Sequence, residues 1–565
     1  MKPSPSFPVH VPDWARDAVW YQIFPERFRN GSRRNDPPLS TITERKIKGW
    51  KTSPWGQDWY RQEPWERALG DFFKSVYYRR FGGDLAGVRE KLGYLCDLGV
   101  NAIYLTPVFM APSLHKYDAA SLHHIDPTFG PDRDGDLRAI ARAKETENPA
   151  TWIWTQADRY FIDLVADIHR HGMRVIIDGV FNHTGRGFFA FQDLRAHGRT
   201  SRYRDWYMVK KWNKDGTFDC DGWFGHTMLP EFARGKDDLA RPVREYIFNI
   251  TDRWMLAGGI DGWRLDVAFC VPHGFWRKWR AHVKKLNPEA YLTAEIVARA
   301  DDYLRGDEFD AVMNYMWLYP TVSFFSPGGS PISATDFKEK LDALLKAYPK
   351  DINYVVQNLL DSHDVGRVTT MLENHALPIT TFEDYFNSSR VNHNRDLVTT
   401  KPGPRAFTAL RQMIVFQMAY LGAPMLYYGT EVGMWGANDS CDRQPMLWDD
   451  VKYEPEASTI TGPCKSRARK PDRALFHFCK RAIAMRTVHP ALRRGTIQWH
   501  STGSERLLAF TRSYAQEEIL VLLNASEHPA TYTLDGAGHD LWNKGETVRK
   551  GRITIEPRGW RVIGF

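Results

Sequence analysis

Three strand-like apolar runs of this chain each deliver a carboxylate at or near their carboxyl ends. The acids are Asp266, Glu295 and Asp364, within the segments 259–266, 291–295 and 354–364. Parallel strands gather such ends at one mouth of a barrel, where a substrate can reach them. Two acids that face each other across a glycosidic bond, with a third nearby, are the groups that cleave sugars. The pattern therefore predicts a carbohydrate-cleaving site.

The spacing of Arg264 and Asp266 places both side chains on one face of a strand. We expect the cation to lower the pKa of Asp266 and to keep it anionic, as a nucleophile requires. Glu295 must instead hold a proton, and neighbouring carboxylates raise a pKa in that direction. Taken singly, an Arg-x-Asp pair is more often structural and an isolated glutamate is more often solvated. The combination on successive strands favours catalysis.

Apolar runs alternate with helical patterns over most of the chain. The strand-like runs are 18–24, 102–106, 174–178, 262–266, 292–295, 309–313, 354–357 and 424–428. Helical patterns such as 85–98 and 160–171 lie between them. Eight strands with interleaved helices predict an α/β fold, a (β/α)8 TIM barrel.

Long interruptions and a change of pattern suggest the domain boundaries. We expect a first barrel part at 1–182 with an insertion at 131–157, a loop domain after strand 3 at 183–240, a second barrel part at 241–487, and a C-terminal antiparallel β-sandwich at 488–565. Trp152 and Trp154 in the insertion either cap a cleft or bury the insertion against the barrel, and we favour burial.

Composition narrows the class further. The net charge of +8 comes from 76 basic and 68 acidic residues spread along the chain, so neither nucleic acid nor membrane is an expected partner. The six cysteines show no CxxC pair, which indicates reduced thiols. Residues 1–8 lack an apolar leader core and no 18-residue apolar run follows, so we expect a cytoplasmic protein. Sequence does not fix its oligomeric state.

Four motifs in order resemble the signature regions of the α-amylase family, glycoside hydrolase family 13. They are Asp178-Gly-Val-Phe-Asn182-His183, Gly262-Trp-Arg264-Leu-Asp266, Ala294-Glu295-Ile296 and Ser362-His363-Asp364. The segments 21–28, 115–118 and 358–364 resemble the cyclomaltodextrinase, neopullulanase and maltogenic amylase branch. Because the first strand begins near Ala18, the N-terminal β domain of that branch is expected to be absent.

The resemblance implies a retaining α-glucan hydrolase acting on maltooligosaccharides, cyclodextrins or related starch and glycogen fragments, with transglycosylation when a sugar replaces water. No cofactor is needed for that chemistry. The implied roles are nucleophile for Asp266, acid and base for Glu295, ring binding for Asp364, substrate contacts for His115, Tyr117, His183, Arg264 and His363, and support of the site for Asp178 and Asn182. The alternatives are an exo-acting α-glucosidase and a catalytically silent amylase-like scaffold.

The resemblance also implies a structural calcium site. Its ligands would be Asn30, Asn35, Asp36, the Gly82 carbonyl and Asp84, and oxygen ligands suit this hard ion. Ser32 stands where the pattern has an aspartate. The competing interpretation is a turn rich in Asn and Asp, held by side-chain hydrogen bonds to the backbone.

Overall fold

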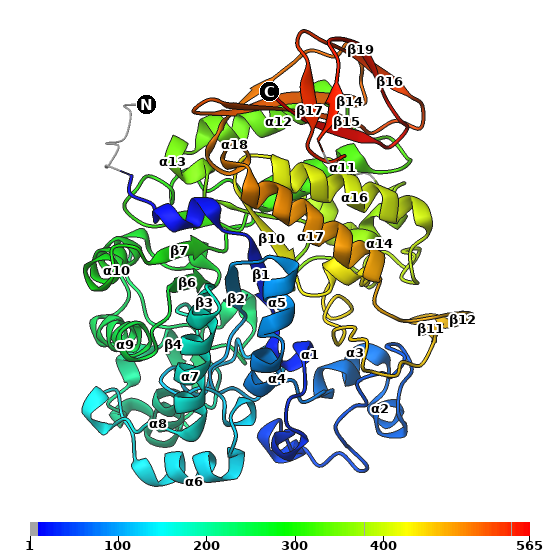
Figure 1. The fold of residues 1–565 in the computed structure, drawn as a ribbon. Helices are drawn as coiled ribbons and strands as arrows, with labels where there is room; N and C mark the ends of the chain where they lie inside the picture. The colour runs from blue at the N-terminus through cyan, green and yellow to red at the C-terminus, as the bar shows by residue number, and fades with distance from the viewer. Residues whose placement is uncertain (1–8, 378, 544) are drawn as a thin grey trace.

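The computed structural model describes residues 9–377, 379–543 and 545–565, so the segment on which the leader expectation rests lies outside it. Within these residues, eight parallel strands form one sheet in the order β8-β7-β6-β3-β2-β1-β10-β9. A parallel bridge between Met313 and Gln357 joins the two outer strands and closes the barrel (Figure 1). The strands are β1 Trp20–Ile23, β2 Ala102–Leu105, β3 Arg174–Gly179, β6 Gly262–Leu265, β7 Tyr291–Ala294, β8 Ala311–Val312, β9 Gln357–Leu359 and β10 Ala423–Tyr427. The predicted barrel is confirmed.

The barrel strands are buried along nearly their whole length, which is why they appear in the sequence as short apolar runs. A few polar side chains interrupt these runs, and residues of neighbouring strands meet in register. Gln22 of β1 lies beside Tyr104 of β2, and Asp178 of β3 lies beside Arg264 of β6. A polar side chain in a fully buried strand needs a partner inside the barrel, so these pairs prepare the site.

Helices form the outer layer of the barrel (Figure 1). They include α4 Leu85–Glu90, α5 Leu92–Leu98, α7 Gln156–Arg170, α9 Arg241–Asp252, α10 His273–Leu286, α11 Tyr315–Phe325, α12 Ala334–Ala347, α16 Pro404–Ala419 and α17 Arg473–Val488. The single helix expected at 85–98 divides at Lys91, where the backbone leaves helical geometry at ψ 7°. Helix α7 begins earlier than expected because Thr155 and Asp158 form a reciprocal capping box.

The excursion after β3 has its own small framework. It contains α8 Phe189–His197 and an antiparallel hairpin of β4 Val209–Trp212 with β5 Phe218–Cys220. An antiparallel bridge between His183 and Glu231 brings the end of the excursion back to the end of β3. Residues far along the loop therefore reach the carboxyl mouth of the barrel.

The C-terminal region forms two antiparallel layers, drawn in orange to red in Figure 1. In the described residues one layer has the order β13-β14-β15-β20-β17-β18, and the other is the pair β16-β19. Their strands are β13 Thr496–Trp499, β14 Leu507–Tyr514, β15 Glu517–Asn524, β16 Ala530–Leu534, β17 Gly538–Asp540, β18 Glu546–Val548, β19 Gly551–Ile555 and β20 Trp560–Gly564. Leu507 and Leu522 pack with Leu534 and Ile555 between the layers, whereas Phe510 belongs to the barrel's hydrophobic cluster.

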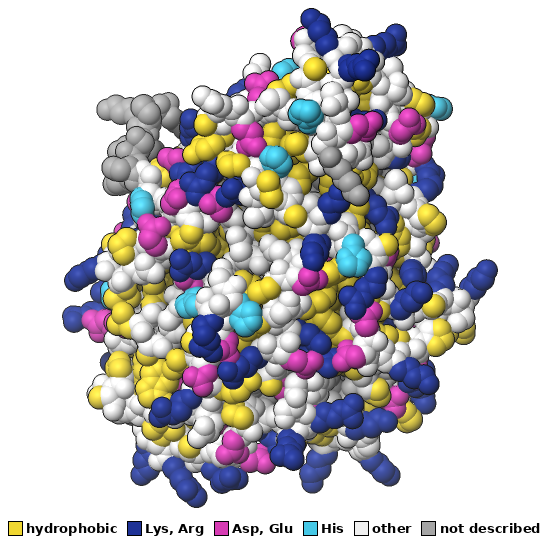
Figure 2. All heavy atoms as spheres, viewed as in Figure 1, with side chains coloured by type: hydrophobic (Ala, Val, Ile, Leu, Met, Phe, Trp, Pro, Cys, Tyr) yellow, Lys and Arg dark blue, Asp and Glu magenta, His cyan; other side chains and the backbone are white. Residues whose placement is uncertain are grey.

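The surface is mixed in charge. Figure 2 shows Lys and Arg side chains distributed over the visible face with acidic side chains among them. Among the described residues, no helix combines the length and apolar character needed to span a membrane.

Candidate active site

One guanidinium, that of Arg264, holds the predicted acids together at the carboxyl mouth of the barrel. Its Nη1 lies 2.9 Å from Asp266 Oδ1 and 2.9 Å from both oxygens of Asp178. Its Nη2 lies 3.0 Å from Glu295 Oε1 and 3.9 Å from Asp364 Oδ2. Arg264 and Asp178 are fully buried, and Asp266 and Glu295 are 6% and 8% exposed. The three strands that end in acids thus converge as the sequence predicted.

Asp364 lies at the more open side of this cluster, with 30% of its side chain exposed. Arg443 reaches it from the loop after β10, with Nη2 3.2 Å from Asp364 Oδ1. The same guanidinium donates from Nε to the carbonyl of His363 at 2.7 Å. Arg443 therefore fixes both the backbone and the carboxylate of this segment, leaving Asp364 Oδ2 directed toward Arg264.

Tyr117 and His363 form a stacked pair beside the acids. Their ring centroids are 5.6 Å apart with an interplanar angle of 10°, and the Tyr117 hydroxyl lies 3.0 Å from Asp178 Oδ2. Gln22 Nε2 contacts His363 Nδ1 at 2.8 Å, which sets the ring orientation from β1. Burial, with Arg443 and Arg264 nearby, holds the pKa of His363 well below its usual value. The side chain is fully buried, and its Nε2 contacts the Tyr117 hydroxyl, so both ring nitrogens have partners.

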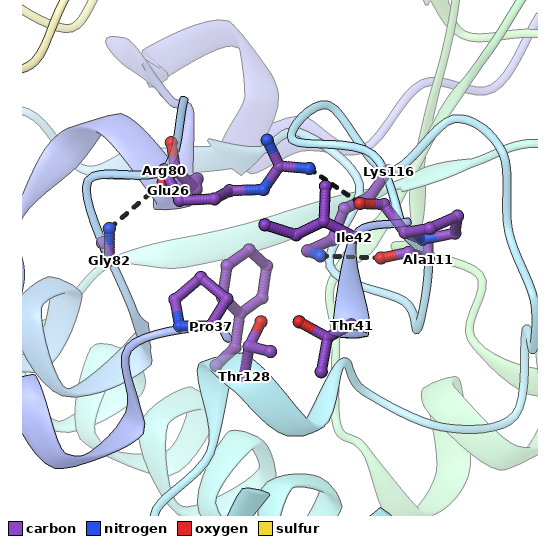
Figure 3. Close-up of a pocket in the computed structure, with 12 residues that line it drawn as sticks. Glu26, Pro37, Thr41, Ile42, Arg80, Gly82, Ala111, Lys116 and Thr128 are labelled. Carbon is purple, nitrogen blue, oxygen red and sulfur yellow. Dashed lines mark hydrogen bonds between the residues drawn. The ribbon is translucent and has the colours of Figure 1, made fainter. Parts of the chain in front are cut away.

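Hydrogen bonds and an ion pair hold the loop that carries His115 and Tyr117 in place (Figure 3). Lys116 Nζ contacts Asp126 Oδ2 at 2.7 Å and donates to the Ala111 carbonyl at 3.1 Å. Arg80 donates to the Pro112 carbonyl at 2.7 Å. The cavity below the loop has a volume of about 10 Å³, the space of about one water molecule, so it is a packing gap and not a sugar site.

Two residues of the site hold unusual backbone angles. Lys116 has φ 61° and Val267 has φ 38°, a region that a β-branched side chain rarely adopts. The strained turn at Val267 directs its N–H to Glu295 Oε2 at 2.9 Å, directly after Asp266 in the chain. Such strain persists where the surrounding structure imposes it, and here it orients the carboxyl group predicted to be the acid.

His183 and Asn182 close the site on the side of the excursion. Asn182 Nδ2 contacts His183 Nδ1 at 3.1 Å, and Arg234 donates to Asn182 Oδ1 at 2.6 Å. His183 Nε2 is buried and has no hydrogen-bond partner among the described residues. Burial lowers the pKa of His183 to about 4, so it presents a neutral ring nitrogen to a ligand.

The protonation of Asp266 differs from our expectation. Burial and the neighbouring carboxylate of Glu295 raise its pKa well above 3.8, and Arg264 opposes this shift without overcoming it. The prediction that the cation keeps this pKa low was wrong, because one guanidinium serves several buried acids. Burial also raises the pKa of Glu295, against Arg264 and with Asp364, which agrees with the expected direction. In the free site, both carboxyl groups therefore keep a proton to a higher pH than solvent-exposed carboxyl groups do.

A pH dependence follows from these raised pKa values. We expect kcat/KM to fall on the alkaline side with an apparent pKa above the ordinary range of a glutamate, because the acid form is lost there. The fall on the acid side should reflect protonation of the second carboxylate. Measuring kcat/KM for maltotetraose between pH 4 and 9 tests this; an alkaline limb in the ordinary range of a solvated glutamate would contradict it.

Several residues of the site were not predicted. Gln22, Tyr104 and Arg443 all contact predicted site residues, Tyr104 by a 2.6 Å hydrogen bond to Asp178 Oδ2. The sequence did mark Gln22 and Tyr104, since each is a polar side chain within an apolar barrel strand. Arg443 comes from an irregular loop with no local pattern.

The predicted calcium residues fall into two groups. Asn30 Nδ2 donates to Asp36 Oδ1 at 2.7 Å, and a Cβ on Gly82 would lie 2.2 Å from the same oxygen. Burial raises the pKa of Asp84 to about 6, with Asp36 contributing, although three backbone N–H groups bind the Asp84 carboxylate. Asn35 instead donates to the Pro127 carbonyl at 3.0 Å.

The donor set around Asn30 fits a hard cation in part. Asn30 Oδ1 is buried without a hydrogen-bond partner among the described residues, and two carboxylates lie close together. An oxygen-liganded ion would satisfy both features. The calcium site stays a prediction, with Asn30, Asp36, Gly82 and Asp84 as the residues that could share one ion.

A closed parallel barrel with paired buried carboxylates at its carboxyl mouth defines a barrel-type glycoside hydrolase. Comparisons with known proteins agree. The sequence model of the α-amylase catalytic domain matches residues 22–147 and 156–383, and the unmatched residues between them lie within the predicted insertion. The chain belongs to the α-amylase family and is a glycoside hydrolase.

The predicted branch is also confirmed. Neopullulanase 2 of Thermoactinomyces vulgaris is 35% identical over 559 residues, covering 98% of this chain and 78% of that protein. A cyclomaltodextrinase of Geobacillus thermopakistaniensis is 34% identical over 534 residues, covering 94% of this chain and 73% of that protein. The structure of the cyclic α-maltosyl-(1→6)-maltose hydrolase of Arthrobacter globiformis is similar with a TM-score of 0.72 at 27% identity, covering 98% of this chain and all of that one.

Proposed function

We propose that the protein is a retaining α-glucan hydrolase that cleaves maltooligosaccharides and cyclodextrins from within the chain or ring. The observation that carries this proposal is the binding of Asp266 and Glu295 to the two terminal nitrogens of one guanidinium. Such proximity suits the carboxyl separation of about 5 to 5.5 Å that a retaining mechanism uses. The names of the neopullulanase and cyclomaltodextrinase relatives support the substrate class.

The two acids have different roles in this chemistry. Glu295 donates its proton to the leaving oxygen while the Asp266 carboxylate attacks the anomeric carbon, so a covalent glycosyl-enzyme forms. Glu295, now anionic, takes a proton from water as the water oxygen attacks the anomeric carbon and displaces the Asp266 carboxylate. The sugar is released with its α configuration retained. A sugar hydroxyl in place of water gives transglycosylation. His183 Nε2, which has no partner among the described residues, and the partly exposed Tyr117 are placed to bind the reacting ring. His363 orients Tyr117 through its contact with the Tyr117 hydroxyl.

Stereochemistry and substrate form test the proposal together. Proton NMR of early products from maltotetraose should show the α-anomer before mutarotation; the β-anomer would refute a retaining mechanism. β-Cyclodextrin has no chain end, so its cleavage separates this enzyme from an exo-acting α-glucosidase. Panose and pullulan then report the choice between α-1,4 and α-1,6 bonds. A silent scaffold would leave all four substrates intact.

We further propose a structural calcium ion at Asn30, Asp36, Gly82 and Asp84. Calcium at millimolar concentration should raise the thermal midpoint above that in EDTA by about 2 to 5 °C, since a ligand bound only to the native state stabilises it. Asp36→Ala should abolish the difference, and differential scanning calorimetry measures it. Equal midpoints for the wild type in both buffers would contradict a calcium site.

We also propose a cytoplasmic location. The support is the intracellular maltogenic amylase of Bacillus subtilis, which is 32% identical over 565 residues. Fractionation of the source cells with an enzyme assay on each fraction tests it, and activity confined to the medium would contradict it.

A further inference from the structure

A second cluster of chemically active side chains lies outside the active site. His123 and His124 belong to the loop after β2, and Glu145 follows α6 Arg133–Ala143. One ligand atom from each lies within 4.8 Å of the other two. The two imidazole Nε2 atoms converge on the same carboxylate oxygen, Glu145 Oε2, at 3.2 Å from His123 and 2.7 Å from His124. All three side chains are at least nine-tenths buried.

The second ring nitrogen of each histidine and the second carboxylate oxygen of Glu145 make hydrogen bonds to other residues. His123 Nδ1 contacts the Tyr246 hydroxyl at 2.9 Å, and His124 Nδ1 contacts Asp158 Oδ2 at 2.8 Å. The Ile153 N–H donates to Glu145 Oε1 at 2.7 Å. Metal-binding histidines use this arrangement, in which a carboxylate or hydroxyl fixes the tautomer and directs the second nitrogen to the ion.

Two of the three separations are close to those of a tetrahedral site, and the third lies within 4.8 Å. Zinc bonds of about 2.0 to 2.2 Å at tetrahedral angles place neighbouring ligand atoms about 3.3 Å apart. The two N···O separations of 3.2 and 2.7 Å need to open by about 0.1 and about 0.6 Å to reach this spacing. Two imidazoles with one carboxylate select zinc and its neighbours, whereas calcium and magnesium prefer oxygen ligands.

Aromatic and cationic groups cover the cluster. The Trp152 ring stacks on His123 with centroids 4.7 Å apart and parallel planes. Arg253 lies over the Trp154 ring at 3.5 Å and reaches Asp158 Oδ2 at 3.2 Å. With neutral imidazoles, Glu145, Asp158 and Arg253 together leave one net negative charge. A positive charge would neutralise the cluster, and either a metal ion or a proton on one imidazole can supply it.

We propose that His123, His124 and Glu145 bind one divalent transition-metal ion of the zinc class. The ion fastens the segment after α6 to the loop that carries His115 and Tyr117. Its role is structural, because the cluster is buried beneath Trp152 and apart from the acids bound to Arg264.

Metal content and thermal stability of the untagged full-length protein test this site. The chain is incubated with zinc chloride and desalted, and zinc is then measured by inductively coupled plasma mass spectrometry. We expect about one zinc per chain and a thermal midpoint that falls by about 2 to 5 °C when dipicolinate removes it. Glu145→Gln keeps an oxygen that accepts from the imidazoles but is a poor metal ligand, so zinc content should fall at least tenfold.

Glu147→Gln is the matched control, because Glu147 lies two residues further on and accepts from the Tyr203 hydroxyl at 2.6 Å. It should retain the zinc content and the chelator response of the wild type. Less than about 0.1 zinc per chain in the wild type, with no chelator response, would show that a proton holds the cluster. Equal zinc in the wild type and Glu145→Gln would place the metal elsewhere. Either result overturns the proposal.

Discussion

Asp266→Asn is expected to lower kcat on maltotetraose or β-cyclodextrin by about 10⁴-fold or more, because the amide cannot form the covalent intermediate. Arg264 retains Asp178 and Glu295 as partners, so the fold should persist. Residual activity within about tenfold of the wild type would contradict the role of Asp266.

The matched control for this variant flanks the other end of the same strand, β6. Asp261, just before β6, pairs with Arg174 at 2.8 Å and contacts His169 at 2.8 Å, at the opposite end of the barrel. Asp261→Asn should lower thermal stability and leave kcat nearly unchanged, since that end of a barrel serves stability.

Asp266→Asn should raise the thermal stability, whereas Asp261→Asn should lower it. The raised pKa of Asp266 means that the folded state holds its proton more tightly than the unfolded chain. The free energy of unfolding therefore falls as the pH rises above the ordinary value of an aspartate. Asparagine removes this penalty, so the thermal midpoint of the variant minus that of the wild type should grow between pH 5 and pH 8.

Glu295→Gln is expected to lower kcat on natural oligosaccharides by about 10³-fold, because the leaving oxygen departs without a proton. A glycosyl fluoride needs no acid to leave, so its first step should be nearly unaffected. Turnover of the fluoride should then stop at the covalent intermediate, since no base activates water. Azide requires no base and should restore turnover.

The comparison of the two substrates makes this result specific. A merely structural role for Glu295 would slow the oligosaccharide and the fluoride equally, and that outcome would contradict our assignment. A burst of fluoride release in the variant, followed by formation of a glycosyl azide, would show that Glu295 acts both as the acid for the leaving oxygen and as the base for water.

The barrel and its acids were predictable from sequence because each depends on local pattern. An apolar run that ends in a carboxylate fixes both a strand and the side chain at its mouth, as β6 does for Asp266. Short strand-like runs, such as those of β14 and β15, likewise indicated the C-terminal sheets. The helix break at Lys91 was missed because a single helical periodicity continues across it.

Interactions between distant segments were not predictable. Arg443 reaches Asp364 from an irregular loop, and nothing in its neighbours marks it. The pKa of Asp266 depends on how many buried acids share Arg264, which spacing along one strand does not reveal. His123 and His124 are adjacent in sequence, but their convergence with Glu145 needs the fold of the segment between them.

The C-terminal layers have a consequence for how this architecture changes over evolution. Residues of β14 and β15 contribute to the hydrophobic cluster between the two layers. Phe510 of β14 also packs on the barrel, with its ring centroid 6.0 Å from that of Phe416 in α16. Arg512 also donates to the Ala419 carbonyl at the end of that helix, at 2.6 Å. The C-terminal domain therefore cannot be exchanged as freely as a domain that is joined only by a flexible linker. Recombination that swaps it between related enzymes must carry the complementary helix surface along with it.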